Sequence, residues 1–186
     1  MQISFQDDYD KAKKRAEEKF TDWKKFREKW LGNLWTDVQA DADASKPEVN
    51  YIKTNVEQLV AALQLKNPEI SIEPVEGGDV DTAAALATLI SNIYERKRVS
   101  EEFTTATRDM ILYGVGYVGI MWDKDDDMGY GNIRAYAISP FNIFLDPLAT
   151  RVKNADYVHI KTLQTPLAVY TKYGVELEES ATDEFT

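Results

Sequence analysis

The first 34 residues repeat their hydrophobic positions every three or four residues. Charged side chains of both signs fill the positions between them. A period of 3.6 residues places such apolar side chains on one stripe of an α-helix. We therefore predict a single long amphipathic helix from Asp7 to about Leu34, which Gly32 and Asn33 bring to an end. The stripe consists of Tyr9, Ala12, Ala16, Phe20, Trp23, Phe26 and Trp30.

A second helix is predicted after a polar linker at residues 36–46. Ser45 is a suitable N-terminal cap, Pro47 fits the first turn, and Asn67 with Pro68 marks the end. The face expected to be buried comprises Val49, Ile52, Val56, Leu59, Val60 and Leu63.

Two more helices follow, with a short strand before them. Residues 70–74 alternate apolar and polar side chains, which indicates a strand that two glycines then interrupt. Asp81 is the expected cap of the third helix. The fourth helix is predicted from about Ser100 to Gly114, where glycine can adopt a left-handed conformation.

After Gly114 the hydrophobic period changes from helical to alternating. Residues 115–122 and 133–138 are predicted to form the two strands of a β-hairpin with a long polar turn. A short extended piece (141–145), a strand (157–163) and a short helix (166–173) follow. The order of elements predicts an α+β fold, with N-terminal amphipathic helices followed by a β-hairpin and a small, mostly antiparallel sheet.

The same pattern divides the chain into three regions. Residues 1–45 are interpreted as a helical arm with its linker, and residues 46–174 as an α+β domain. Residues 175–186 carry five acidic and no basic side chains, so we interpret them as an acidic tail.

Composition and charge narrow the possible functions. A hydrophobic content of 44% is that of a globular protein, and the lack of cysteine excludes disulfides and thiol catalysis. The net charge of −10 argues against general phosphate binding, which needs clustered lysine and arginine. No apolar run is long enough to span a membrane and the N-terminus lacks the features of a signal peptide, so cytoplasmic synthesis is expected.

The sequence offers no positive sign of catalysis, of a metal site or of a cofactor. Asp123, Asp125 and Asp127 resemble the start of a calcium loop, but the sixth and twelfth positions hold Met128 and Arg134 in place of glycine and glutamate. A metal-dependent nuclease that adds Asp146 to these carboxylates stays open as an alternative. The only histidine, His159, is interpreted as structural.

The aromatic stripe of the first helix is the most distinctive surface that the pattern predicts. These aromatic side chains, with lysines beside them, could in principle stack on the bases of a nucleic acid. Their helical spacing instead favours a stripe that packs against other parts of the protein or a neighbouring subunit. Because aromatic anchors concentrate binding energy at interfaces, the stripe is a candidate contact surface between subunits. The candidate residues are Tyr9, Phe20, Trp23, Phe26 and Trp30.

Three segments between residues 46 and 174 together resemble tailed-phage portal proteins. Residues 46–52 and 68–70 resemble the portal pattern of an asparagine-bearing helix followed by a proline and a strand. Residues 109–118 are similar to the portal helix that runs into a glycine-punctuated strand. Residues 138–147, followed by 155–157, are similar to the segment that closes the hairpin. The scaffold residues in these segments are Asn50, Tyr113, Gly114, Gly116, Pro140, Asp146 and Pro147.

The resemblance implies a structural role and no enzymatic activity. Portal proteins form homo-oligomeric rings, commonly of twelve subunits, at one capsid vertex of the virion, and double-stranded DNA passes through them. A terminase motor, the capsid and head–tail connector proteins are the implied partners. We expect this chain to correspond to the front of the portal wing, without stem or clip.

The subunit contacts of such a ring would join two different surfaces, for which we expect the aromatic helix and the β region. A head–tail adaptor or a stand-alone prophage assembly module is the structural alternative.

Overall fold

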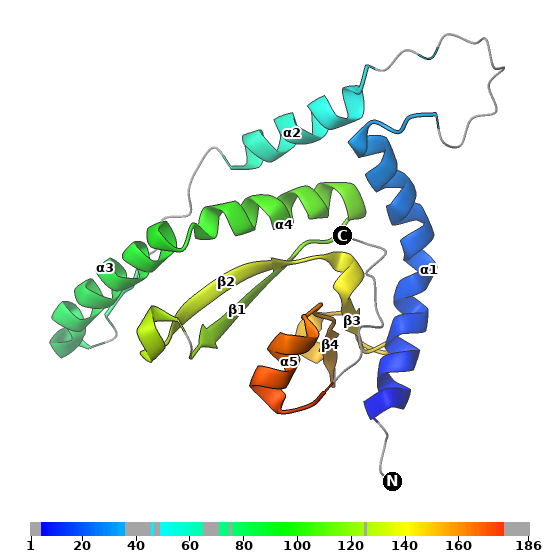
Figure 1. Cartoon of the computed structure of the whole chain (residues 1–186). Helices are drawn as coiled ribbons and strands as arrows, with labels where there is room; N and C mark the ends of the chain where they lie inside the picture. Colours follow the sequence, from blue (N-terminus) through cyan, green and yellow to red (C-terminus); the bar gives the residue numbers. More distant parts are fainter. Residues whose placement is uncertain are drawn as a thin grey trace. The chain divides into compact units, whose positions relative to one another are not determined.

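The computed structural model describes residues 5–35, 46, 49–64, 71–74, 76–124 and 126–176, and it has the predicted α+β fold (Figure 1). The strands form two separate antiparallel pairs, β1 with β2 and β3 with β4. The helices are α1 (Phe5–Leu31), α2 (Tyr51–Leu63), α3 (Val80–Arg96), α4 (Val99–Tyr113) and α5 (Pro166–Tyr173). The strands are β1 (Tyr117–Asp123), β2 (Asn132–Ile138), β3 (Ile143–Leu145) and β4 (Val158–Ile160).

The chain forms two compact units, and their boundary passes through α1. One comprises residues 21–140 and is called here the hairpin unit. The other comprises residues 1–20 and 141–186 and is called the two-segment unit. Each unit has its own small core, so each is described by itself.

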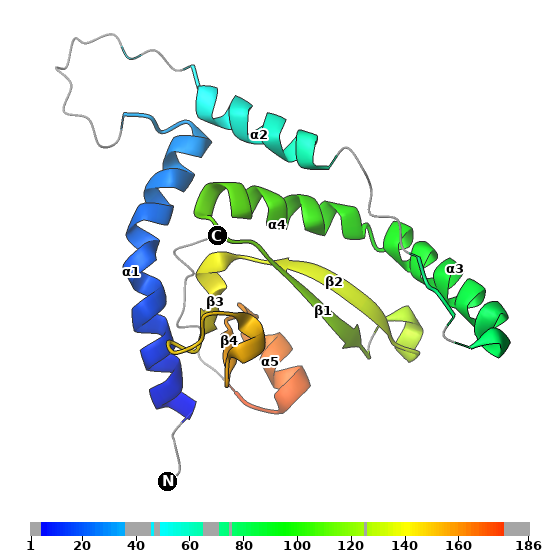
Figure 2. The same cartoon turned by 180° about the vertical axis from the view of Figure 1, so that it is seen from behind.

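Helix α4 is the central element of the hairpin unit. It lies between α2 and the β1–β2 hairpin in both views (Figures 1 and 2) and also contacts α3. The Glu102 carboxylate of α4 accepts a 2.7 Å hydrogen bond from the backbone N–H of Ala137 in β2. The buried apolar side chains of this unit are Val56, Val60, Ala83, Val99, Ala106 and Ile138.

The two-segment unit is built around the β3–β4 pair, in which Phe144 lies opposite His159. Ala12, Phe20, Phe141, Ile143 and Phe144 are its buried apolar residues. Helix α5 begins as the sequence predicts, because the Thr165 hydroxyl accepts a hydrogen bond from Ala168 N–H and Pro166 occupies the first turn. Gly174 ends it with a φ of 69°.

The predicted start of the second helix needs correction. Helix α2 begins at Tyr51, and its cap is Asn50, whereas Ser45 and Pro47 lie outside the described residues. Val49 precedes the helix and is exposed. Of the six residues expected on a buried face, only Val56 and Val60 are buried, because α4 covers one narrow side of α2. The predicted end at Asn67 and Pro68 also lies outside the described residues, and α2 stops at Leu63.

Two further predictions are wrong. Residues 71–74 form no strand, although Ile70 lies outside the described residues. Helix α3 begins at Val80, so Asp81 lies within its first turn, and its N-cap residue, Asp79, makes no side-chain capping bond. An aspartate in the first turn still favours the helix through its charge near the positive end of the helix dipole.

The long first helix, the fourth helix, the hairpin and the last helix are confirmed. Gly32 follows α1 with a φ of 108°, and Gly114 follows α4 with a φ of 79°. Both values lie in the left-handed region that favours glycine, which explains why the two helices stop where the sequence indicates.

Gly116 fixes how closely β1 approaches α4. A Cβ added there would lie 2.0 Å from the Ala106 carbonyl oxygen, which belongs to the helix backbone.

We therefore expect Gly116→Ala to lower the free energy of unfolding by about 2 kcal/mol or more, because the strand must move away from the helix. Urea unfolding measures the loss. The matched control is Gly78→Ala, where an added Cβ meets nothing within 4 Å. Equal stability losses in the two variants would contradict the close approach.

Candidate functional site

Many large hydrophobic side chains are exposed in the described part of the chain. Among the residues that the structure describes, 28 large hydrophobic side chains are exposed and 11 apolar side chains are buried. Scattered exposed apolar residues are normal, but groups of them mark surfaces that bind other molecules. The exposed faces, and the contacts that position them, are therefore the candidate functional surfaces of this chain.

Two of the predicted interface residues, Tyr9 and Phe20, pack inside the two-segment unit. The Tyr9 ring meets Phe144 edge-on at a centroid distance of 5.3 Å. Phe20 is only 7% exposed, and its ring lies 5.2 Å from that of Phe141. These aromatic pairs join the first part of α1 to the β3 region, which gives both residues a role within the subunit.

The remaining three candidates, Trp23, Phe26 and Trp30, belong to the hairpin unit. Trp23 is half-buried, and its ring lies 5.7 Å from that of Tyr113 at the end of α4. Trp30 is also half-buried. Phe26 is 48% exposed, the highest exposure among the five predicted interface residues. Of the predicted set, Phe26 is thus the residue most open to another molecule.

Trp30 stands at a junction of three helices. Lys53 Nζ of α2 lies 5.7 Å from the centre of its ring, and the Arg108 guanidinium of α4 lies 5.9 Å away. Arg108 also forms two hydrogen bonds with Glu57 of α2, at 2.9 and 3.1 Å. This two-pronged pairing is the main reason that the pKa of Glu57 is lowered, and it raises the pKa of Arg108. The cluster fastens α2 to α4 beside the end of α1.

Asn50 connects the end of α1 to the start of α2. Its side-chain amide donates to the carbonyl oxygens of Lys29 and Trp30, at 3.2 and 2.9 Å, and its oxygen accepts from Lys53 N–H at 2.9 Å. One side chain thereby satisfies two carbonyls at a helix C-terminus and one N–H at a helix N-terminus, which otherwise lack partners.

Asp109 of α4 is a partly buried carboxyl group in the same unit. Burial raises its pKa to about 6, and the nearby guanidinium groups of Arg108 and Arg27 offset part of that effect. Burial also raises the pKa of Tyr113, with a further contribution from the Asp109 charge. The charged form of Asp109 is therefore less favourable in the folded chain than in the unfolded chain, and the carboxyl loses its proton in the folded chain at a higher pH.

The other scaffold residues lie where the chain turns or passes close to itself. Pro140 is fully buried, Pro147 is half-buried, and Gly114 closes α4 through a 2.9 Å bond from its N–H to the Met110 carbonyl. Asp146 is 8% exposed, and its carboxylate accepts backbone N–H groups of Leu148 and Asp156, at 2.9 and 3.4 Å. A carboxylate that is occupied in this way stabilises a loop.

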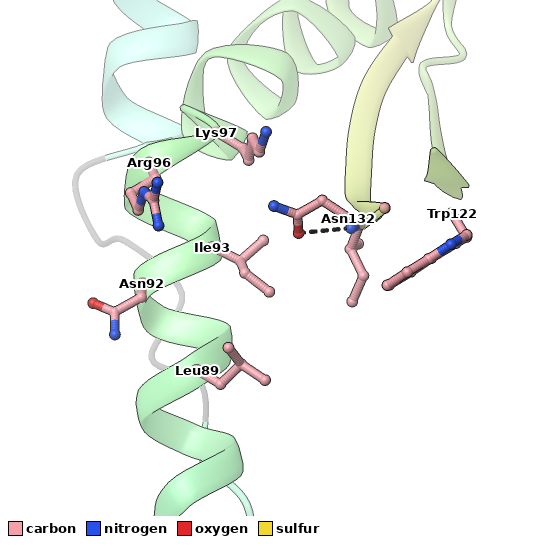
Figure 3. Close-up of a pocket in the computed structure, with 9 residues that line it drawn as sticks. Leu89, Asn92, Ile93, Arg96, Lys97, Trp122 and Asn132 are labelled. Carbon is pink, nitrogen blue, oxygen red and sulfur yellow. Dashed lines mark hydrogen bonds between the residues drawn. The ribbon is translucent and has the colours of Figure 1, made fainter. Parts of the chain in front are cut away.

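An open groove between α3 and the hairpin is the main feature that the sequence did not predict. It has a volume of about 550 Å³ and lies entirely within the hairpin unit. Figure 3 shows Leu89 and Ile93 of α3 pointing toward Asn132 and Trp122 of the hairpin. Gly131 leaves room for the Trp122 indole ring, since a Cβ added at Gly131 would lie 2.7 Å from it. The groove is lined by Leu89, Asn92, Ile93, Arg96, Lys97, Trp122, Gly131, Asn132 and Ile133.

The acidic turn does not assemble a metal site within the described part of the chain. Asp123 pairs with Arg134 at 3.5 Å, and Asp126 pairs with Lys97. Asp125 and the side chain of Asp127 lie outside the described residues. No group of three potential ligands is found among the residues that can be placed.

His159 packs against aromatic rings of its own unit. Its ring lies 4.8 Å from that of Phe5 and 5.1 Å from that of Tyr157. Its Nε2 atom is buried without a hydrogen-bond partner. These contacts give the imidazole a packing role in the core of the two-segment unit.

Within the described ranges, no helix has the length and apolarity needed to cross a bilayer.

The bridging role of Asn50 can be tested with two substitutions. Asn50→Asp keeps an oxygen that caps α2 but removes the amide donor, whereas Asn50→Ala removes both. We expect a loss of about 1 kcal/mol for Asn50→Asp and about 2 kcal/mol for Asn50→Ala, measured by chemical unfolding. An Asn50→Ala variant no less stable than Asn50→Asp would show that the capping oxygen contributes nothing.

Asp109 predicts a specific dependence of stability on pH. The folded-state pKa of Asp109 is raised above its ordinary value of 3.8. The protonated carboxyl therefore contributes to the free energy of unfolding fully below about pH 4, and this contribution is lost as the pH rises through about 6. Asp109→Asn should therefore stabilise the protein by about 1 kcal/mol at pH 8, after allowance for solvent screening. The gain should disappear near pH 4. Thermal unfolding at both pH values measures it, and a gain that is the same at both would contradict the assignment.

The comparisons with known proteins give one family. A search of curated proteins finds no match to the chain. The family model described as phage P22-like portal protein matches residues 3–184, which covers all of the hairpin unit and nearly all of the two-segment unit. A match over nearly the whole sequence establishes membership of the family. The chain is a member of the P22-like family of phage portal proteins, structural components of the virion that serve in DNA packaging.

Proposed function

We propose that this chain is a subunit of a homo-oligomeric portal ring through which phage double-stranded DNA enters and leaves the capsid. The observation that carries the proposal is the family match over residues 3–184. The surplus of exposed over buried hydrophobic side chains supports it, because a subunit that is covered by neighbours has no need to bury those faces alone.

A closed ring requires two different surfaces on each subunit. Contacts that repeat head to tail generate a ring when the rotation closes, whereas a self-complementary contact gives a dimer. In the hairpin unit, Phe26 lies on one exposed face, and Ile52, Leu59 and Leu63 share a second face along α2 through their helical spacing. The groove between α3 and the hairpin provides a third face, this one concave.

The partners in this proposal are the terminase motor, the capsid shell and the head–tail connector proteins, and synthesis takes place in the host cytoplasm. DNA passes without sequence-specific contact, consistent with a net charge of −10, which disfavours tight phosphate binding. The role is structural. The division into arm, wing-like domain and acidic tail is part of the same proposal.

The mass of the purified full chain in solution tests the ring. Native mass spectrometry should show a discrete species of about twelve times the chain mass of 21.2 kDa. Static light scattering at several concentrations provides a second measurement of the same quantity. A chain that stays monomeric at every concentration would show that these residues do not suffice for assembly, and the proposal for this chain would fall.

A further inference from the structure

Helices α3 and α4 are separated by a break that the local sequence does not explain. The two helices follow each other directly and change direction where they meet (Figures 1 and 2). Residues 80–113 contain neither glycine nor proline, the residues at which helices usually bend sharply. Residues 95–98 are Glu, Arg, Lys and Arg, which are all good helix formers. By local preference alone, the whole stretch would form one helix.

The break is made at a single residue, Arg98. Its φ of 49° and ψ of 42° place it in the left-handed region, which residues other than glycine occupy at a cost in free energy. Before it, the Lys97 N–H still bonds to the Ile93 carbonyl at 2.9 Å. After it, the Glu101 N–H bonds to the Arg98 carbonyl at 2.9 Å. Return of Arg98 to the right-handed region, with a smaller adjustment at Lys97, would therefore join α3 and α4.

An ion pair holds the end of α3 against the turn of the hairpin. Lys97 pairs with Asp126, and each of these side chains is 29% exposed. Asp126 is itself fixed in the turn, because its backbone carbonyl accepts the N–H groups of Gly129 and Gly131 at 3.2 and 3.0 Å. A strained backbone conformation persists only where surrounding contacts enforce it, and this ion pair is placed next to the strained residue.

Helix α3 packs lightly against the rest of the hairpin unit. Within the described part of the chain, Ala83 is the one residue of α3 that is buried. Leu86 and Leu89 are 44% and 53% exposed, and the open groove lies between α3 and the hairpin. By contrast, the first residue of α4, Val99, is 8% exposed. The start of α4 is thus firmly packed, whereas little apolar contact opposes a movement of α3.

We propose that the junction of Lys97 and Arg98 is a hinge that the Lys97–Asp126 ion pair keeps bent. While the pair is formed, Arg98 is held in the left-handed region and α3 forms one wall of the groove. When the pair is broken, α3 and α4 become one continuous helix, and that wall is displaced. The inference goes beyond the proposed ring and does not depend on it, because every residue involved lies within residues 21–140.

The distance between two labels, one on each helix, distinguishes the bent form from the straight form. The chain contains no cysteine, so spin labels can be attached at Leu86→Cys in α3 and Met110→Cys in α4, where the native side chains are 44% and 46% exposed. Along an unbroken helix these positions lie about 36 Å apart, at roughly 1.5 Å per residue, and a bend shortens this distance. Labelled full-length chain is mixed with an excess of unlabelled chain, so that pulsed electron paramagnetic resonance measures distances within one chain.

Arg98→Ala and Arg98→Gly are the matched pair of variants for the hinge. Both remove the side chain and its 3.5 Å ion pair with Glu101. Alanine favours the right-handed region, whereas glycine adopts the left-handed region readily. We expect the population with the unbroken-helix distance to be about tenfold larger in Arg98→Ala than in Arg98→Gly. Equal populations in the two variants would overturn the hinge.

Substitutions of the ion pair test what keeps the hinge bent. Lys97→Met removes the charge and should raise the population with the unbroken-helix distance about tenfold. Adding Arg98→Gly to Lys97→Met should return the bent form, and so should the exchange of Lys97→Asp with Asp126→Lys. The control, Arg96→Met, removes a neighbouring charge outside this ion pair and should leave the distances unchanged.

Three results would overturn the proposal. The first is a distance distribution in Lys97→Met that equals that of the unsubstituted chain, and the second is an equal response to Arg96→Met. The third is a broad distribution in Lys97→Met without a maximum near the unbroken-helix distance, because α3 would then be detached from α4. Circular dichroism checks that helical content is kept. If Lys97→Met loses it, the two Arg98 variants decide, since they leave the ion pair in place.

Discussion

The close approach of the hairpin to α4 is the constraint on which the hairpin unit depends. Gly116 brings the start of β1 against the Ala106 carbonyl, at a distance that excludes even a methyl group. The Glu102 carboxylate then holds β2 through the Ala137 N–H. An isolated two-stranded hairpin is marginally stable in water, so β1 and β2 need this helix as their support. The same helix provides the surface against which α2 packs.

The junction around Trp30 determines where α2 can lie. Asn50 joins it to the end of α1, and the Glu57–Arg108 pair joins it to α4. Because one side of α2 is fastened by these polar contacts, its apolar residues beyond Val56 and Val60 are left on the surface. A side that a monomer leaves exposed is available to a neighbouring subunit, and this links the polar junction to assembly.

Membership of the portal family gives a reason for the distribution of hydrophobic residues. In the proposed ring, neighbouring subunits would cover apolar side chains that stay exposed in the isolated chain. The groove between α3 and the hairpin is one of the exposed faces, and it is lined in part by Leu89, Trp122 and Ile133.

The sequence by itself determined the type and order of most elements. The aromatic period of α1, the glycine that ends α4, the alternation of the hairpin strands and the Thr-Pro start of α5 are local signals, and local backbone preferences fix them. The segments that indicated the family are of the same local kind. Only the tertiary structure decided which apolar faces are buried and which cap begins α2, because these depend on partners distant in sequence. Asn50 acts as a cap and bridge because α1 ends beside it. The groove exists because α3 and the hairpin, separated along the chain, face each other with Leu89 on one side and Trp122 on the other, and no periodicity in either segment encodes that arrangement.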